Sequence, residues 1–281
     1  MVIIDCHVHA EKMANFEGDM EEILNEDGKI ELSQENRNPL LDKNVILQSM
    51  KKAGIDLSVL IVVATRGNMS KTMDLNDSLN SLCKNEKKFV GFGSVHPNDG
   101  EESLIEMERC VNELDLRGFK FHPTSQNFVC DDPNFIQIMK KAVDLDVPIL
   151  VDSYNPFVDD QPVRILKALM QAPQIKLILA HVGLFRFMDF NVFGFLQKTK
   201  QLPIENVYFD LTATPLIFLN SPFQQQFRWV TEQIGSDRLL FGSDYSGNSQ
   251  KESIKAIKKF GYKKKWLPKI LGENASKLLK I

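Results

Sequence analysis

Eight short apolar runs, each rich in β-branched or aromatic residues, recur along the chain. They lie at Val2–Cys6, Ser58–Ala64, Phe89–Val95, Gly118–Phe121, Pro148–Val151, Lys176–Ala180, Val207–Leu211 and Arg238–Gly242. From the second run onward they begin roughly thirty residues apart, which is the length of one strand-and-helix unit. Residues 59–63 are apolar throughout, as is typical of strands that are buried on both faces of a parallel sheet. The pattern therefore predicts eight parallel strands.

The segments between these runs carry apolar residues at helical spacing. Three such stripes are Leu104, Met107, Val111 and Leu114; Phe135, Ile138, Met139 and Ala142; and Phe227, Val230 and Ile234. Apolar positions three and four residues apart line the face of a helix that packs on a core. Eight strand-and-helix units predict a closed (β/α)8 TIM barrel that takes in residues 1–281 as a single domain, with an open doubly wound sheet as the alternative.

The connection after the first run is much longer than the others. Roughly thirty residues, rich in acidic residues, Asn and Gly, precede the first predicted helix near Asp42–Ala53, and loops of this length are usually functional or disordered. In a TIM barrel this loop would lie on the catalytic face. We therefore predict a lid over residues 10–41, with a merely mobile insertion as the alternative.

The composition excludes several classes of protein. With 43% hydrophobic and 25% charged residues, the chain is too apolar and too evenly charged to be disordered. It has no apolar stretch of about 18 residues that would span a membrane, and its first residues lack the basic region of a signal peptide. The four cysteines, Cys6, Cys83, Cys110 and Cys130, form no CxxC pair. Scattered free thiols indicate a reducing compartment, so we expect a cytoplasmic protein.

The net charge of −3 is the sum of two opposite segments. Residues 11–35 hold nine acidic residues and two lysines, whereas residues 251–280 hold ten lysines and two acidic residues. A basic segment can bind nucleic acid or an anionic membrane. Here Ile254, Ile257 and Phe260 accompany the lysines at helical spacing, which indicates the solvated face of an amphipathic helix. We expect neither a nucleic-acid nor a membrane partner.

All five histidines lie at or just beyond the C-terminal end of a predicted strand. His7 and His9 follow the first run, and the others follow the third, fourth and sixth runs: His96, His122 and His181. The C-terminal ends of barrel strands form the catalytic face, so these side chains should converge although they are far apart in the sequence. His96 is the least supported of the five, and we expect a structural role for it.

His7-Val8-His9 is the sharpest local signal. Alternate residues of a strand point the same way, so the two imidazoles project from one face and can bind one cation. Asp244, after the eighth run, would face them because the first and eighth strands of a closed barrel are neighbours. A carboxylate there can bind the metal, orient its water or accept a proton, and a helix N-cap is the alternative. Asp210 is a weaker candidate, for which a capping or loop role is equally expected.

Lys120 lies two residues before His122, so the two side chains share a face of their strand. A lysine inside a barrel is costly unless it is paired or functional. It would bind an anionic substrate or neutralise a carboxylate of a neighbouring strand. Arg66 and Arg186 follow the second and sixth runs, and their guanidinium groups suit a substrate carboxylate. A plain surface role is the alternative for both arginines.

Five short motifs are spread over nearly the whole chain. They are Asp5-x-His7-x-His9, Gly118-Phe119-Lys120-Phe121-His122-Pro123, Ala180-His181-Val182-Gly183, Phe241-Gly242-Ser243-Asp244 and Leu271-Gly272-Glu273-Asn274-Ala275. In this order and spacing they resemble the amidohydrolase superfamily, specifically its branch of aminocarboxymuconate-semialdehyde decarboxylase-like proteins (amidohydrolase 2). The resemblance implies a metal-dependent TIM-barrel enzyme in which His7, His9 and Asp244 bind the metal. It also implies that His181 activates the bound water or contacts the substrate.

The fifth run departs from the family pattern. Family members usually carry a ligand histidine at its end, whereas this chain has Asp152 there, followed by Ser153 and Tyr154. A carboxylate can bind zinc at a similar distance, but it is a harder ligand and adds a negative charge. Asp152 would bind the metal directly and favour a hard ion such as Mn²⁺, reach it through water, or mark a relative with a weakened site. We favour direct or water-mediated binding, because the other motif residues are intact.

The residues and the resemblance together predict a metal-dependent hydrolase of amide or ester bonds, or a decarboxylase, that acts on a small carboxylate with a metal-activated water. Its cofactor would be one divalent ion, Zn²⁺ before Mn²⁺. The expected catalytic residues are Asp244 and His181, the expected metal ligands are His7, His9, Asp152 and Asp244, and the expected substrate-binding residues are Lys120, His122, Tyr154, Arg66 and Arg186.

Other interpretations stay open. A two-metal site would need a carboxylated Lys120 as its bridge. A metal-dependent phosphoesterase or nuclease would use similar residues, although we would expect more carboxylates at the strand ends than residues 118–123 offer. A degenerate barrel would have kept the fold and lost the metal. The sequence also leaves a homo-oligomer open.

Overall fold

The computed structural model describes residues 2–11, 40–200 and 202–281 of the chain. Eight parallel strands form one sheet in the order in which they follow each other in the sequence. The strands are β1 (Ile4–His9), β2 (Leu57–Ile61), β3 (Phe89–Gly93), β4 (Gly118–Phe121), β5 (Ile149–Asp152), β6 (Leu177–Ala180), β7 (Val207–Asp210) and β8 (Leu239–Leu240). Each strand overlaps one of the eight runs predicted from the apolar pattern.

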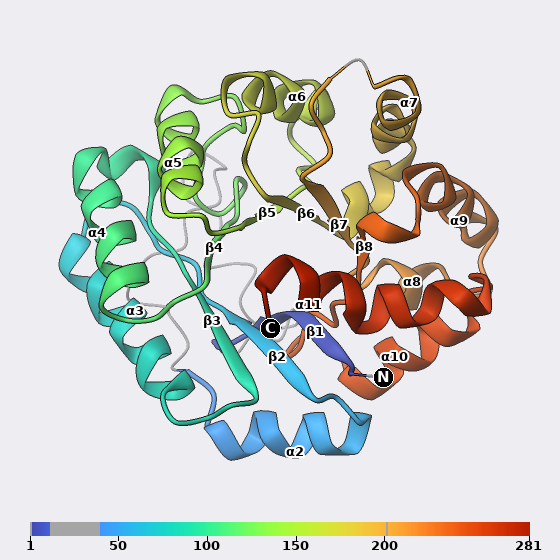
Figure 1. The fold of residues 1–281 in the computed structure, drawn as a ribbon, viewed down its shortest axis with the longest axis horizontal. Helices are drawn as coiled ribbons and strands as arrows, with labels where there is room; N and C mark the ends of the chain where they lie inside the picture. The colour runs from blue at the N-terminus through green and yellow to red at the C-terminus, as the bar shows by residue number, and fades with distance from the viewer. Residues whose placement is uncertain (1, 12–39, 201) are drawn as a thin grey trace.

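Hydrogen bonds between the ends of β1 and β8 close the sheet into a barrel. The Cys6 amide donates to the Phe241 carbonyl at 2.9 Å, and the Asp244 amide donates to the His7 carbonyl at 2.9 Å. Figure 1 shows the strands at the centre of the molecule with the helices around them. The predicted (β/α)8 barrel is confirmed. An open doubly wound sheet is excluded because β1 is hydrogen-bonded to the residues directly after β8.

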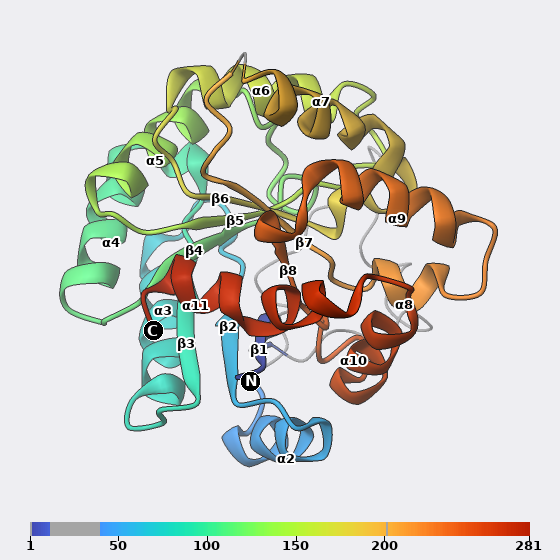
Figure 2. The same cartoon turned by 45° about the vertical axis from the view of Figure 1, so that its right-hand side comes forward.

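Helices connect the strands and cover their outer side (Figures 1 and 2). They are α2 (Lys43–Ala53), α3 (Met69–Cys83), α4 (Glu101–Asn112), α5 (Pro133–Asp144), α6 (Gln161–Gln171), α7 (Asn191–Thr199), α8 (Thr214–Phe218), α9 (Phe223–Ile234), α10 (Gln250–Lys259) and α11 (Asn274–Leu279). Shorter helical turns are η2 (Pro97–Asp99), η3 (His181–Phe190), η4 (Ser236–Arg238), η5 (Lys264–Trp266) and η6 (Lys269–Glu273). Within the described ranges, no helix has the length and apolar character that crossing a bilayer requires.

Two apolar clusters stabilise the barrel. The larger one lies between the strands and the surrounding helices and includes residues of all three predicted stripes. In the smaller one, Leu278 and Leu279 of α11 join Ile4 at the start of β1. Lys280, next to α11, pairs with Asp146 just before β5, so α11 covers the N-terminal end of the barrel. The C-terminal ends of the strands lie at the opposite end of the barrel, where TIM-barrel enzymes carry their active sites.

A bulge in β1 sets which way its histidines point. Ile4 belongs to the inner cluster and Val8 to the outer one, although strict alternation would place both on one face. The pairing with β2 shifts register between Asp5 and Val8, as happens where a strand contains one extra residue. His7 and His9 therefore face the inside of the barrel, and His9 is the last residue of the strand.

The predicted lid over residues 10–41 lies mostly outside the described residues, and so does the acidic segment at 11–35. The two described ends of this connection meet. The Leu41 amide donates to the Ala10 carbonyl at 2.7 Å, and Glu11 and Leu40 form an antiparallel bridge. The two described ends of the connection thus lie side by side, and the lid remains a prediction.

Candidate active site

The C-terminal end of the barrel brings most of the predicted site residues together. They come from six strands or the residues directly after them: His7 and His9 (β1), Lys120 and His122 (β4), Asp152 (β5), His181 (β6), Asp210 (β7) and Asp244 (β8). The imidazole ring of His7 has its centroid 5.3 Å from the centroids of both the His9 and the His181 rings. Strands that are distant in sequence thus supply one polar centre at the C-terminal end of the barrel.

His7 is held by Asp210. Its Nδ1 lies 2.7 Å from Asp210 Oδ2, and Asp210 also accepts the Thr212 amide and the Thr212 hydroxyl. A carboxylate on Nδ1 keeps the proton there and leaves the Nε2 lone pair free for a metal. Burial and the Lys120 ammonium lower the pKa of His7 to about 4, so the ring is neutral at pH 7, as a metal ligand must be. Asp210 therefore has the expected loop role, through its bonds to Thr212, and also orients the ring of His7.

His181 is oriented in a similar way by a backbone carbonyl. Its Nδ1 lies 3.1 Å from the Thr212 carbonyl oxygen, to which it can only donate. Its Nε2 lies 3.2 Å from Asp152 Oδ2. Burial by itself would lower the pKa of His181, but the Asp152 carboxylate outweighs it and raises the pKa to about 9. Without a metal, the His181 ring is therefore protonated and paired with Asp152, and an ion bound at its Nε2 would displace the proton from that nitrogen.

Three of these side chains form a compact set of donor atoms. One nitrogen each of His7 and His181 and one oxygen of Asp244 lie within 4.8 Å of one another. His9 Nε2 lies 3.3 Å from Asp244 Oδ1, at the edge of the set. Two imidazoles and a carboxylate are ordinary ligands of Zn²⁺ and Mn²⁺, and both imidazoles are oriented through their second nitrogen, as metal ligands usually are. The donor set therefore fits one divalent ion.

Asp152, which the sequence predicts to bind the metal directly or through water, contacts two histidine rings of the centre. Its Oδ1 accepts the Tyr154 amide at 2.9 Å, and its Oδ2 faces the Nε2 atoms of His181, at 3.2 Å, and His122, at 3.7 Å. Burial opposes ionisation, but the two histidines hold the pKa of Asp152 well below its usual range. Asp152 is thus an ionised acceptor for two rings, while His181, expected to be catalytic, supplies a donor atom to the compact set.

Lys120 is wholly buried inside the barrel, and its Nζ lies 3.4 Å from His7 Nε2. Burial lowers the pKa of Lys120, while the carboxylates around it act in the opposite direction. His122 is half-buried, and its Nδ1 accepts the Ser125 amide at 3.2 Å. That bond leaves the proton of the neutral ring on Nε2, toward Asp152. Lys120 and His122 thus present N–H donors to the centre.

His96 serves the fold. Its Nε2 donates to the Gln126 carbonyl at 2.8 Å, and its Nδ1 accepts the Asn98 amide at 3.1 Å. The Gln126 side chain also donates to the carbonyls of Ala64 and Val95. These bonds tie together the loops after β2, β3 and β4. The structural role expected for His96 is confirmed, because both of its ring nitrogens are committed to the backbone.

The two predicted arginines lie in different surroundings. Arg186 donates to Asp159 Oδ1 at 2.9 Å, to the Asp159 carbonyl at 2.9 Å and to Asp189 Oδ2 at 3.1 Å. It therefore joins the segments after β5 and β6. Arg66 is exposed in the loop after β2. Tyr154, half-buried after β5, packs the edge of its ring against Phe185, with 6.1 Å between the centroids.

The sequence analysis missed three buried hydroxyl residues around His181: Ser153, Thr212 and Thr214. Ser153 follows β5 directly, and the two threonines follow the end of β7. Their place just after strand ends was the only signal, and it does not distinguish them from ordinary loop residues. Only the folded structure shows that they donate to or accept from the backbone and ring of His181 and its neighbours.

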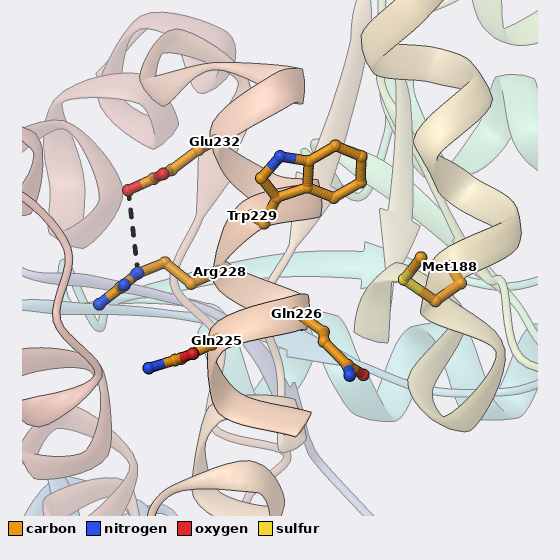
Figure 3. A pocket seen from close by; sticks show the side chains of 6 residues that line it. All are labelled: Met188, Gln225, Gln226, Arg228, Trp229 and Glu232. Carbon is orange, nitrogen blue, oxygen red and sulfur yellow. Dashed lines mark ion pairs between the residues drawn. The ribbon is translucent and has the colours of Figure 1, made fainter. Parts of the chain in front are cut away.

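A separate hollow lies on the outside of the barrel, along α9 (Figure 3). It has a volume of about 390 Å³ and is lined by Met188, Gln225, Gln226, Arg228, Trp229 and Glu232. Arg228 and Glu232 form an ion pair of 4.0 Å along the helix. No histidine or carboxylate of the centre lines this hollow, so it is a feature of the outer surface and not of the candidate active site.

A comparison with families of known proteins agrees with this centre. The sequence model of the family described as Amidohydrolase matches residues 4–281, which is nearly the whole chain. The chain belongs to the amidohydrolase family. It is therefore an enzyme of this superfamily, as the order and spacing of the five motifs predicted.

Similar proteins include several decarboxylases. The 2-amino-3-carboxymuconate-6-semialdehyde decarboxylase of Dictyostelium discoideum is 27% identical over 123 residues, which are 41% of this chain and 34% of that protein. The match thus spans about a third of the relative. A 5-carboxyvanillate decarboxylase from Sphingomonas paucimobilis has 14% identity and a TM-score of 0.69, over 100% of this chain and 99% of that one. A dihydroxybenzoic acid decarboxylase from a Polaromonas species, with bound manganese and 2-nitroresorcinol, has 20% identity and a TM-score of 0.69, over 99% and 97%.

Proposed function

We propose that this amidohydrolase is a metal-dependent decarboxylase of a small aromatic carboxylate. The observation that carries the proposal is the convergence of His7, His181 and Asp244 at the C-terminal end of the barrel, with the buried Lys120 against His7. The decarboxylases among its relatives and structural neighbours support this choice of reaction. Hydrolysis of the amides or esters of such acids is the alternative that the experiment below separates.

We assign His7, His181 and Asp244 as the ligands of the ion. His9 contacts the ligand Asp244 at the edge of this set. His181 has only Nε2 to offer, because its Nδ1 is committed to a backbone carbonyl. We favour Mn²⁺ over the Zn²⁺ expected from the sequence, because carboxylates are hard ligands and Asp152 adds a second acid close by. A structural neighbour that holds manganese supports this choice. When bound, such an ion polarises a substrate oxygen as a Lewis acid.

Lys120 and His122 are the residues that we propose for recognition of the substrate anion. Both present N–H donors to the centre, and the Lys120 ammonium is shielded from water, where attraction between charges is strongest. Tyr154 and Arg66 are proposed to line the rim. Arg186 is left out of the proposal, because its guanidinium is already bound by the carboxylates of its own chain.

Decarboxylation requires that a proton replace the departing CO₂. The bond between the ring carbon and the carboxylate carbon breaks, its electron pair stays on the ring carbon, and that carbon takes up a proton. We propose that Asp244 moves this proton. Its side chain is 16% exposed, so it is open to the substrate side, and its Oδ1 lies 3.5 Å from His7 Nε2 and 3.3 Å from His9 Nε2.

The experiment starts from metal-stripped protein that has been reloaded with Mn²⁺ or Zn²⁺. This protein is incubated with a panel of acids and their derivatives. The aromatic acids are 2,6-dihydroxybenzoate and 5-carboxyvanillate, and the derivatives are their methyl esters and amides. The acyclic 2-amino-3-carboxymuconate-6-semialdehyde tests whether the substrate must be aromatic. Release of CO₂ that depends on added metal supports the proposal. Release of methanol or ammonia without CO₂ would make the protein a hydrolase, and failure to bind any divalent ion would refute both activities.

A pair of variants links the activity to this centre. Asp244→Asn should lower the rate of CO₂ release by about 10²–10⁴-fold, which is the usual contribution of a positioned acid or base. Asp77→Asn is the control. It removes a carboxylate that pairs with Arg109 at 2.8 Å on α3, outside the barrel, and should leave the rate unchanged. Equal rates for the two variants would contradict the role of Asp244.

A further inference from the structure

The chain takes an unusual course directly after β6. His181, Val182, Gly183 and Leu184 have φ values of 62°, 50°, 74° and 46°. Residues other than glycine rarely adopt this left-handed region, and four in succession persist only where the surrounding structure holds them. This turn, residues 181–184, carries the imidazole of His181. Whatever holds the turn therefore also sets the position of that ring.

Ser153 holds the turn from the side of β5. Its hydroxyl donates to the Ala180 carbonyl, at the end of β6, and accepts the Gly183 amide at 2.9 Å. One hydroxyl thus bridges the residues that flank His181 and Val182. Ser153 is 1% exposed, so water does not have ready access to replace these two bonds.

Thr214 and Phe190 hold the turn from other sides. The Thr214 hydroxyl donates to the His181 carbonyl at 2.8 Å. The Phe190 ring packs so closely on Gly183 that a Cβ there would meet the ring at 2.3 Å. The turn is therefore fixed between the loops after β5 and β7 and against an aromatic ring. Of these contacts, only the one from Ser153 bridges both ends of the backbone segment around His181.

We propose that Ser153 is a positioning residue, whose hydroxyl holds the turn so that His181 Nε2 faces Asp152 and the donor atoms of His7 and Asp244. Ser153 follows Asp152 directly in the sequence. The end of β5 thus supplies both the acceptor for the His181 ring and the support for its backbone. The consequence for catalysis rests on the proposed function, but the positioning is a property of the turn itself.

Ser153→Ala tests this proposal, with Ser94→Ala as the matched control. Ser94 is also buried just after a strand, and its hydroxyl accepts the Ala64 amide at 2.9 Å and donates to the Lys120 carbonyl at 2.8 Å. Its bonds therefore join strand ends in the same way as those of Ser153. They lie on the other side of the barrel centre, between β2 and β4, and do not touch the turn.

Two measurements report on His181 without turnover. In protein labelled with ¹⁵N-histidine, the Nδ1–H that is bound to the Thr212 carbonyl should give a slowly exchanging signal, which is assigned by its loss in His181→Asn. We expect Ser153→Ala to shift or lose this signal and to weaken Mn²⁺ binding about tenfold in calorimetric titrations, as loss of an indirect support of a ligand does. Ser94→Ala should leave both unchanged, although each variant lowers Tm.

The proposal is overturned if Ser153→Ala leaves the His181 signal and the Mn²⁺ affinity unchanged, or if Ser94→Ala changes them equally. Should Ser153→Ala fail to fold, Ser153→Cys takes its place, because a thiol keeps the shape and is a poor hydrogen-bonding group. For Ser153→Cys, too, an unchanged His181 signal and an unchanged Mn²⁺ affinity would overturn the proposal. A protein that decarboxylates none of the tested acids overturns the proposed function but leaves this test intact, since neither measurement needs a substrate.

Discussion

Asp152 stands where the family usually carries a histidine. The substitution Asp152→Asn keeps the shape of this side chain and removes its negative charge. In the structure, Asp152 Oδ2 lies 3.2 Å from His181 Nε2. A positive charge at that distance, whether the Nε2 proton or an ion that displaces it, is attracted to the Asp152 carboxylate by about 5 kcal/mol per unit charge at an effective dielectric constant of about 20. Water and the neighbouring carboxylates offset much of this, and indirect partners of metal-binding histidines typically contribute about 10–100-fold to metal affinity. We therefore expect Mn²⁺ to bind about 10–100-fold more weakly, or by about 1.4–2.7 kcal/mol.

Calorimetric titration of the metal-stripped protein with Mn²⁺ measures this loss. Asp77→Asn is again the control. This substitution also removes one negative charge, but the Asp77 carboxylate is half-exposed on α3. Because exposed ion pairs contribute little, we expect the Mn²⁺ affinity of Asp77→Asn to stay within about twofold of the wild type. An unchanged affinity in Asp152→Asn would refute the coupling of Asp152 to the site. A loss beyond about 1000-fold would refute its indirect role and make it a ligand, as direct ligands contribute more than their partners do.

Three further predictions concern the surroundings of the centre. In Gly242→Ala, a Cβ would meet Thr212 Oγ1 at 2.0 Å, so we expect a loss of about 1–3 kcal/mol in thermal unfolding, and a wild-type Tm would contradict this. Lys120→Met removes a buried charge and keeps the apolar stem, so we expect undiminished stability in urea but at least about tenfold weaker binding of 2-nitroresorcinol or benzoate anions; lower stability with intact binding would contradict it. Burial raises the pKa of Cys83 and of Cys130 to about 12, so a disulfide reagent at pH 8 should modify the thiols rapidly only in denaturant, and fast reaction of the native protein would show otherwise.

The barrel could be predicted from the sequence because strands that are buried on both faces have apolar residues at nearly every position. Residues 59–63 are apolar without interruption, and β2 occupies Leu57–Ile61. The bounds were less exact where pairing decides them. The first run was predicted at Val2–Cys6, but β1 continues to His9 because its end pairs with the residues after β8. The bulge that turns His7 inward has no signature in the pattern, because it depends on the register with β2.

The candidate site could be predicted as a set of residue types at strand ends, but not as a set of contacts. The sequence placed Asp152 among the ligands, since it stands where the family carries a histidine. The structure places Asp152 against His181 and His122, and His181 beside the donor atoms of His7 and Asp244. Which of two acids meets a given imidazole depends on distances of a few ångströms, and spacing along the chain does not contain them.

The sequence by itself determined the eight-fold alternation of strands and helices, the gathering of histidines and acids at the strand ends, and the motifs of the amidohydrolase family. These are local properties, since apolar period and residue type are set within one strand-and-helix unit. The tertiary structure decided which nitrogen of His7 faces the centre, which ring Asp152 holds and how Ser153 supports the turn. His7 and Asp210 are 203 residues apart in the sequence, so only closure of the barrel could bring their side chains into hydrogen-bonding distance.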